Sequence, residues 1–467
     1  MNDSGVFGDN ILTYISHHIG KFISRSNARS SSWKHKLLFD RQHLPRSIFR
    51  RLAYRRDGST RPALQSWLAP ELGMTNISGK SETDKPWLNT CRMAHRALAT
   101  FPETSDLHRI NVVTDNISHS SLFGGVATSL ILAALWADRV KADLRIITRT
   151  QKPDQTSLGI VLAANGIEFT RPVDFRFCPH IGGREISVGP NDIFLTTSWW
   201  TTRCLLNTVP PDRIVFLLNE DEETLFPKSK KYIKTNSTLN EPIRNVVINS
   251  HLLYSHITEG ADAAPGLSQK VLTFQPAFTH IPRSFEKQSK KRKLLLYVQP
   301  QSSGVNINNC IDIIDAAVKN SLLNKNDWEI YFIGQESREV IFHEDLDVHL
   351  RKPMHWAEYI HFIRKMDAGI SFTNTSFPTS LPLDLASIGV PVMTNYLSEH
   401  KDNVPYSDNI ISVPSTKEDM LDGLRRLIDL SGDLPRCAAQ MRSDHIQRSW
   451  EETFAPTLAA LEAAWPK

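Results

Sequence analysis

The sequence has few cysteines and no long apolar run. Its five cysteines among 467 residues are an odd number, and no two have the spacing of a CxxC pair or of zinc ligands. A disulfide scaffold and a zinc module are therefore excluded, and a reduced, cytoplasmic compartment is expected. No window approaches the roughly 18 to 20 apolar residues of a membrane span, and no signal-peptide pattern is visible. The most apolar stretch, residues 126–136, predicts a buried helix instead.

Several familiar motifs are also missing. The chain has neither the GxGxxG fingerprint of dinucleotide-binding proteins nor the Walker spacing of P-loop proteins. It contains no internal repeat, no low-complexity tract and no DNA- or RNA-binding motif, so nucleic acid is not an expected partner. With 40% hydrophobic and 22% charged residues, the composition is that of a globular protein large enough for more than one domain.

The net charge of +4 is unevenly distributed along the chain. Residues 21–61 contain twelve Lys or Arg against Asp40 and Asp57, a local balance of +10, which leaves −6 for the remainder. Such a segment is either a solvated arm or an arm attracted to anionic lipid. Apolar residues within it, at 37–39 and 48–49, favour the second interpretation, a peripheral attachment to the inner face of the membrane.

From about residue 107, short β-branched runs alternate with helical segments, which predicts parallel sheets covered on both faces. The first series of expected strands is 110–114, 144–148, 193–196, 214–218, 246–248 and 271–274. A polar segment, 281–293, reads as a linker, and a second series follows at 294–298, 328–333, 348–350, 369–372, 390–393 and 410–413. We therefore expect an α/β protein with two Rossmann-like domains facing across a cleft. The predicted divisions are a basic, partly helical extension at 1–106, domains at 107–285 and 286–445, and a helical segment at 446–467, interrupted at Pro456.

Three features of the first series point to ligand contacts. Gly124 and Gly125 precede a helix and leave backbone N–H groups open to an acceptor hydroxyl or a sugar phosphate, unless they serve only close packing. Trp199 and Trp200 can stack on an acceptor sugar ring, although one of the two is expected in the core. His119, near the first strand, is either structural or in contact with the donor.

The second series contains the sharpest signal, at residues 377–392. A loop opens a short helix whose first turn is expected to carry Asp384. The helix N–H groups of Thr379, Ser380 and Leu381 can meet a diphosphate, and the carboxylate can accept hydrogen bonds from ribose hydroxyls. The alternative is an ordinary charge that complements the helix dipole.

At these residues the sequence resembles GT-B fold glycosyltransferases of family 4, specifically the WsaF-like rhamnosyltransferases of bacterial surface-polysaccharide and S-layer glycan assembly. The acidic motif of the family is matched by Pro382-Leu-Asp-Leu-Ala-Ser-Ile-Gly389, with Asp in place of the commoner Glu. The stretches 123–128, 196–202 and 216–227 are also similar, and the resemblance spans about residues 107 to 450.

The resemblance implies roles for further residues. Glu222 lies at the family's acidic position in the first domain and is either an acceptor-orienting or proton-accepting group or part of a surface acidic cluster. Gln299 stands where the group usually carries an Arg, and Ser376 replaces the first of two paired carboxylates. The diphosphate then needs another cation, and Lys352, Arg351 or Lys401 can supply it.

The function implied is transfer of a sugar, a deoxyhexose such as rhamnose, from dTDP-rhamnose or a similar nucleotide sugar to a glycan or lipid-linked glycan, with retention. No DxD-like motif occupies a strand end, so no metal and no other cofactor is expected. The losses at Ser376 and Gln299 keep a second hypothesis open, a non-catalytic carbohydrate-binding or scaffold protein on a decayed GT-B frame. A nucleotide-sugar epimerase is a third, although no acid and base pair can be assigned to it.

Overall fold

The chain divides into two compact units, Met1–Pro86 and Trp87–Lys467. The computed structural model describes parts of the second unit, and the basic segment 21–61 lies outside the described residues. The described residues are 96–118, 121–122, 124–179, 185–220, 237–258, 267, 270–286, 290–297, 307–333, 346–351, 354, 356–372, 380–396 and 406–465.

Among the described residues, the first α/β domain is built on seven parallel strands in the order β4-β3-β2-β6-β7-β8-β9. Their bounds are β2 (Arg109–Thr114), β3 (Asp143–Thr148), β4 (Val173–Phe177), β6 (Asp192–Thr196), β7 (Ile214–Leu218), β8 (Asn245–Asn249) and β9 (Val271–Phe274). Two short strands, β1 (Thr100–Pro102) and β5 (Ile186–Val188), pair in parallel as a separate small sheet.

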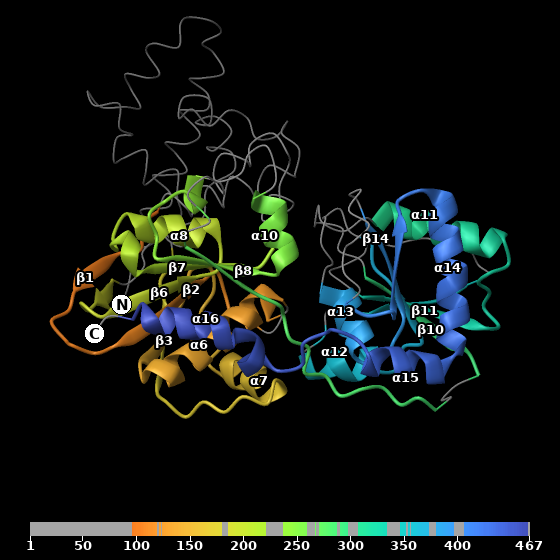
Figure 1. Ribbon diagram of the computed structural model, residues 1–467, viewed down its shortest axis with the longest axis horizontal. Coiled ribbons are helices and arrows are strands. Elements are labelled where there is room, and N and C mark those ends of the chain that lie inside the picture. The colour runs from red at the N-terminus through yellow and green to blue at the C-terminus, as the bar shows by residue number, and fades with distance from the viewer. Residues whose placement is uncertain are drawn as a thin grey trace, which may run out of the picture. The chain divides into compact units, whose positions relative to one another are not determined.

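Helices cover both faces of this sheet (Figure 1). On one face the core includes apolar residues of α6 (Gly125–Val140), α7 (Thr156–Ala164) and α16 (Trp450–Ala463). On the other face the core includes residues of α8 (Trp199–Leu206) and α10 (His251–Thr258), with the single turn η3 (Pro211–Arg213) leading into β7. Both faces of the strands are therefore buried, as continuous β-branched runs predict.

The second α/β domain has a parallel sheet in the order β12-β11-β10-β13-β14-β15. Its strands are β10 (Arg292–Tyr297), β11 (Trp328–Ile333), β12 (Asp347–Arg351), β13 (Ala368–Ile370), β14 (Val392–Tyr396) and β15 (Ile410–Pro414). Helices α11 (Ile307–Lys319), α14 (Lys417–Gly432) and α15 (Leu434–Arg442) contribute to the core on one face, and α12 (Trp356–Ile363) and α13 (Ser380–Ser387) to the core on the other. The prediction of two parallel-sheet α/β domains is confirmed.

The expected strands are present, and the apolar stretch 126–136 lies within the buried helix α6. The sequence did not reveal β1, β4 and β5, which are short and interrupted by polar residues or by Pro102. The predicted interruption at Pro456 is wrong, because α16 continues through this residue. Burial of Trp450, Phe454, Leu458 and Leu461 on one face of the helix offsets the lost backbone hydrogen bond.

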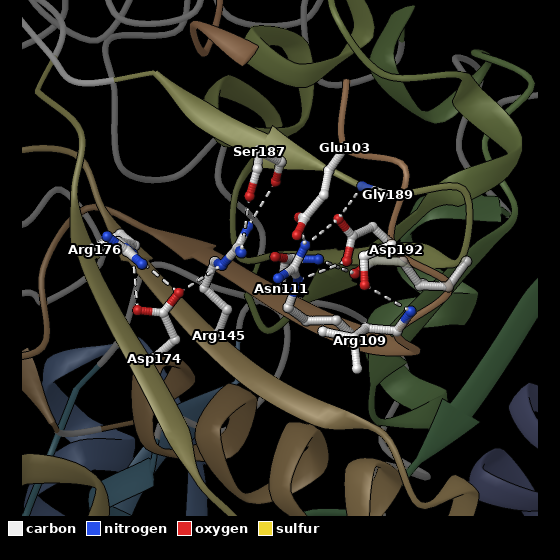
Figure 2. A network of polar contacts seen from close by, with 12 residues as sticks. Glu103, Arg109, Asn111, Arg145, Asp174, Arg176, Ser187, Gly189 and Asp192 are labelled. Carbon is white, nitrogen blue, oxygen red and sulfur yellow. Dashed lines mark hydrogen bonds and ion pairs between the residues drawn. The ribbon is translucent and has the colours of Figure 1, made fainter. Parts of the chain in front are cut away.

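A buried ionic network joins the amino ends of β2 and β6 (Figure 2). The Arg109 guanidinium donates to both carboxylate oxygens of Asp192, with Nε–Oδ1 and Nη2–Oδ2 distances of 2.8 and 2.9 Å, and to Glu103 Oε2 at 3.0 Å. Asp192 also accepts from the Gly189 N–H at 2.7 Å. Burial lowers the pKa of Arg109, but the bonds to Asp192 and Glu103 raise it more. The network therefore holds the ions charged and aligns the two strands.

Within the described ranges, no helix combines the length and the apolar character that a membrane crossing requires. Four described cysteines, Cys178, Cys204, Cys310 and Cys437, are free thiols and are buried. Burial raises the pKa of the Cys204 thiol to about 11, so it behaves as a small apolar core residue rather than as a nucleophile.

Candidate functional site

The strand order of the first sheet reverses between β2 and β6. In open parallel sheets, ligands bind outside the carboxyl ends of the strands at such a switch point. Asp115 directly follows β2, and the segment Thr197–Ser198 leads from β6 into α8. The side chains of these two connections therefore define the candidate site of this domain.

Asp115 and Trp200 form a hydrogen-bonded pair at the switch point. The Trp200 indole Nε1 donates to Oδ1 and Oδ2 of Asp115, at 3.1 and 3.0 Å. A capping box fixes the start of α8: the Ser198 hydroxyl accepts from the Thr201 N–H, and the Thr201 hydroxyl accepts from the Ser198 N–H. Because the cap sets the direction of the first turn, it also sets the position of the indole.

The Asp115 carboxyl is only partly exposed, and its pKa is raised from the ordinary 3.8 to about 6. Burial is the main cause, and the Trp200 N–H together with the charge of Arg149 partly offsets it. The carboxylate is therefore ionised at neutral pH and is more basic than a solvated aspartate. Since one bifurcated N–H occupies only part of its lone-pair capacity, it can still accept a hydrogen bond from a ligand hydroxyl.

The amino end of α6 lies at the same edge of the sheet, next to the end of β7. Gly124 adopts φ +67°, and the structure gives the helix no side-chain cap and no acidic residue in its first turn. The Asn219 Nδ2 donates to the Gly125 carbonyl at 3.2 Å, and a Cβ at Gly125 would stand 2.9 Å from that nitrogen. Gly124 is therefore required for backbone conformation, and Gly125 for the close approach of Asn219.

The structure thus brings Gly124, Gly125 and Trp200 to one edge of the sheet. Trp199 is a core residue, 1% exposed, and its ring meets that of Trp200 edge to face at 5.7 Å. One of the two tryptophans was expected in the core, and it is Trp199. Two other residues proposed for this domain, Glu222 and His119, lie outside the described residues.

The sequence predicted Asp384 in the first turn of its helix, and this prediction is wrong. Helix α13 begins at Ser380, so Asp384 is its fifth residue, and it is 5% exposed. Its Oδ1 is 2.8 Å from His280 Nε2, and its Oδ2 accepts from the Tyr359 hydroxyl at 2.9 Å. Burial, and then the charge of Asp384, raise the pKa of Tyr359 well above its ordinary value, so the phenol stays protonated as the donor. The carboxylate is therefore a buried link between helices α12 and α13 and the segment between β9 and β10, and its binding to ribose stays a prediction.

The other residues proposed for the donor are only partly described. Ser380 is exposed at the start of α13, and Leu381 is buried behind it. The Arg351 guanidinium lies over the rings of Tyr331 and Phe362, at 5.6 and 5.8 Å from their centroids. The remaining candidates, Thr379, Gln299, Lys352 and Lys401, and with them Ser376, lie outside the described residues.

Asp115 was not predicted from the sequence. A carboxylate directly after the first strand of a parallel sheet is a usable signal, because that position falls at the switch point whenever the order reverses there. No metal centre is formed by the described part of the chain, in which no group of three His, Cys, Asp or Glu side chains comes together. Metal independence of the reaction stays a prediction.

Solved structures of GT-B glycosyltransferases have a similar fold. TarM has 10% sequence identity and a TM-score of 0.51, and the match covers 76% of this chain and 98% of TarM. WaaG, a glycosyltransferase involved in lipopolysaccharide biosynthesis, has 13% identity, a TM-score of 0.48 and coverages of 75% and 98%. Sucrose-phosphate synthase from Thermosynechococcus elongatus has 9% identity, a TM-score of 0.47 and coverages of 76% and 100%.

Two parallel-sheet domains of this kind define the GT-B fold. The N-terminal domain of WsaF matches residues 109–251 and its C-terminal domain matches residues 292–425, which together are more than half of the chain. The chain therefore belongs to the WsaF family. No curated protein sequence gives a significant match.

The raised pKa of Asp115 predicts a pH-dependent stability. Between pH 3.8 and about 6 the folded state binds more protons at this carboxyl than the unfolded state, so stability falls as the pH rises through that window. Asp115→Asn stays neutral and keeps an oxygen for the Trp200 N–H. We expect the variant to be more stable than the parent at pH 7.5, by ~1 to 3 kcal/mol in chemical denaturation.

The gain should shrink as the pH is lowered from 7.5 to 4.5. Asp138→Asn, at an exposed carboxylate near the end of α6, is the matched control and should show no such pH-dependent gain. A gain at Asp115 that is independent of pH, or a loss of stability at pH 7.5, would contradict the assignment.

The two glycines predict different responses to an added methyl group. Gly125→Ala should lose ~1 to 3 kcal/mol because its Cβ would overlap Asn219, and the combined change with Asn219→Gly should recover most of this loss. Gly124→Ala has open space but a positive φ, so its loss of ~1 to 2 kcal/mol should be unaffected by Asn219→Gly. Unfolding of the single and double variants measures both couplings, and equal coupling at the two glycines would refute this account.

Proposed function

We propose that this glycosyltransferase moves a deoxyhexose, rhamnose, from dTDP-rhamnose to a glycan or lipid-linked glycan in cell-surface polysaccharide synthesis, with retention of configuration. The observation that carries the acceptor side is the Asp115 carboxylate, held by the Trp200 indole at the carboxyl ends of β2 and β6. The resemblance to WsaF-like rhamnosyltransferases supports the choice of sugar and donor.

In this proposal Asp115 accepts a hydrogen bond from the hydroxyl that attacks the donor sugar. Its raised pKa strengthens that bond, and its link to Trp200 fixes the direction of the lone pairs. The open N–H groups at the start of α6 lie at the same edge of the sheet and can hold a further acceptor oxygen. In a same-face route the departing phosphate takes the proton, so Asp115 acts by orienting the acceptor and needs no covalent intermediate.

The donor is proposed to bind the second domain. The first turn of α13, at Ser380 and Leu381, supplies backbone N–H groups for the diphosphate together with Thr379. Gln299 and the cations Lys352 and Lys401 are proposed to complete the donor contacts. Glu222 and His119 are retained as proposed catalytic residues on the strength of the resemblance and their sequence positions.

Release of dTDP from dTDP-rhamnose tests the function directly. With a lipid-linked glycan fraction as acceptor, Asp115→Asn should lower turnover by a factor of ~10² or more and leave the affinity for dTDP unchanged in calorimetry. Asp138→Asn should retain full turnover. UDP- and GDP-sugars assayed in parallel test the choice of nucleotide.

Two results would redirect the proposal. Equal losses of turnover and dTDP affinity would place Asp115 on the donor side or make its role structural. Glycan binding by the parent protein without release of any nucleoside diphosphate would favour the second hypothesis, a non-catalytic carbohydrate-binding protein on a GT-B frame.

We further propose that the basic segment 21–61 attaches the enzyme to the cytoplasmic face of an anionic membrane, where a lipid-linked acceptor is also confined. Each Lys or Arg near such a surface contributes about 1 kcal/mol, and the segment carries a balance of +10. The protein should sediment with vesicles that contain anionic lipid and dissociate as salt rises from 0.1 to 1 M, where the Debye length falls from ~10 to ~3 Å. Deleting residues 1–62 should abolish sedimentation but not dTDP binding. Salt-insensitive sedimentation, or none at low salt, would contradict the attachment.

A further inference from the structure

A cavity of about 540 Å³ lies in the first domain, outside the Asp115 site. It is lined by the carboxyl half of the edge strand β4, by the segment that connects β3 to α7, and by residues of the small β1–β5 sheet. Its volume is in the range of small-ligand pockets. No residue placed in the proposed transfer reaction lines it.

The cavity is rich in positive charge. Arg145, Lys152 and Arg176 line it against a single acidic lining residue, Glu185. Arg145 is 3% exposed and is locked in place: its Nε donates to Asp174 at 3.0 Å and its Nη1 to the Ser187 carbonyl at 2.8 Å (Figure 2). The Arg145 guanidinium therefore contributes positive electrostatic potential to the cavity but is not free to move toward a ligand.

Two cations remain able to contact a ligand. Arg176 uses its Nε on Asp174, at 2.9 Å, and its side chain is 56% exposed (Figure 2). Lys152 is exposed and has no hydrogen bond or ion pair within the described part of the chain. Asp174 already pairs with Arg145 and with the Nε of Arg176, whereas Lys152 has no such partner among the described residues. A negatively charged ligand group can therefore pair with Lys152 and share the remaining N–H groups of Arg176.

Aromatic rings supply the other part of the lining. Phe175 and Phe177 of β4 and Phe101 of β1 all contribute, and Phe101 is 46% exposed, unusual for a phenylalanine. The apolar face of a pyranose ring packs well on such rings. Cations beside exposed aromatic surface therefore fit a sugar that carries a carboxylate or a phosphate better than they fit a neutral sugar or a bare anion.

The cavity also lies near the proposed acceptor site along the backbone. The Thr150 N–H and hydroxyl both donate to the Asp115 carbonyl, each at 2.8 Å. Lys152 follows two residues later, and two residues of chain span at most ~7 Å. An oligosaccharide whose terminal sugar lies at Asp115 can therefore reach Lys152 with a preceding residue.

We propose that this cavity binds an anionic sugar of the acceptor chain, a uronic acid or a phosphorylated sugar, behind the residue that receives the transferred sugar. The inference rests on the proposed function for the identity of the ligand as acceptor. Binding of an anionic sugar in this cavity would make the enzyme selective for acidic glycans, through contacts that lie away from the reacting hydroxyl.

Ligand-observed NMR titration of the full-length protein tests the cavity without a donor. Methyl β-D-glucuronide and methyl β-D-glucoside differ only in the carboxylate, and glucose 6-phosphate is the phosphate probe. We expect the glucuronide or the phosphate to bind at least ten times more tightly than the glucoside, and the better of the two identifies the anion. Lys152→Ala and Arg176→Ala should each weaken that probe at least fivefold, and Phe101→Ala should weaken both it and the glucoside.

Lys141→Ala, at an exposed lysine after α6, and Asp115→Asn should leave the binding of the anionic probe unchanged. Equal affinity for charged and neutral probes, or full affinity after Lys152→Ala combined with Arg176→Ala, would overturn the inference. Anion-selective binding without nucleotide-sugar turnover contradicts only the proposed transfer, whereas turnover without such binding contradicts only the cavity.

Discussion

The ion pair between Arg109 and Asp192 is the interaction on which the geometry of the first domain depends. It joins β2 to β6, the two strands between which the order of the sheet reverses, and it lies at their amino ends. A bidentate pair with a fully buried carboxylate tolerates little sliding, so it fixes the register of these strands. Removal of one partner would leave a buried charge, typically at a cost of about 3 to 5 kcal/mol. Since β2 and β6 are aligned at this end, Asp115 and Trp200 emerge side by side at the other.

The two ends of these strands differ in how their charged side chains are compensated. At the amino ends Arg109 is paired with both Asp192 and Glu103, so these three charges compensate one another. At the carboxyl ends the Asp115 carboxylate is desolvated, and among the described residues an indole N–H and the more distant charge of Arg149 offset this only in part, so its pKa is raised. A group that lowers stability at neutral pH and is nonetheless held by a capped helix is typical of a functional site rather than of a structural one. In the proposed function, the charged form accepts a hydrogen bond from the acceptor hydroxyl.

The fold was predictable from the sequence because its signals are strong and local. The runs at 214–218, 271–274 and 328–333 are rich in β-branched and aromatic residues, and β7, β9 and β11 have those bounds. The site was less predictable, because its residues depend on tertiary contacts. Only the packed structure decides that Trp199 faces the core and Trp200 the site. Asp384 was expected in the first turn of its helix, but proline is tolerated in a first turn, where N–H groups lack partners, so that turn contains Pro382 and Asp384 falls behind it.

The interior position of Asp384 changes what its carboxylate can do for the donor helix. His280 belongs to the segment between β9 and β10, and further residues of that segment contact the same domain: Arg283 Nη2 donates to Asp367 at 2.7 Å, and the Phe285 ring occupies the space beside Gly389 where a Cβ would stand. These residues are therefore packed against the second domain: His280 on α13, Arg283 on the residue that precedes β13, and Phe285 on the turn that follows α13. Because α13 presents its amino end to the proposed diphosphate site, its position depends on the linker as well as on its own sheet. Asp384, with one oxygen on His280 and the other on Tyr359 of α12, is the side chain that connects the segment between β9 and β10 to the helix.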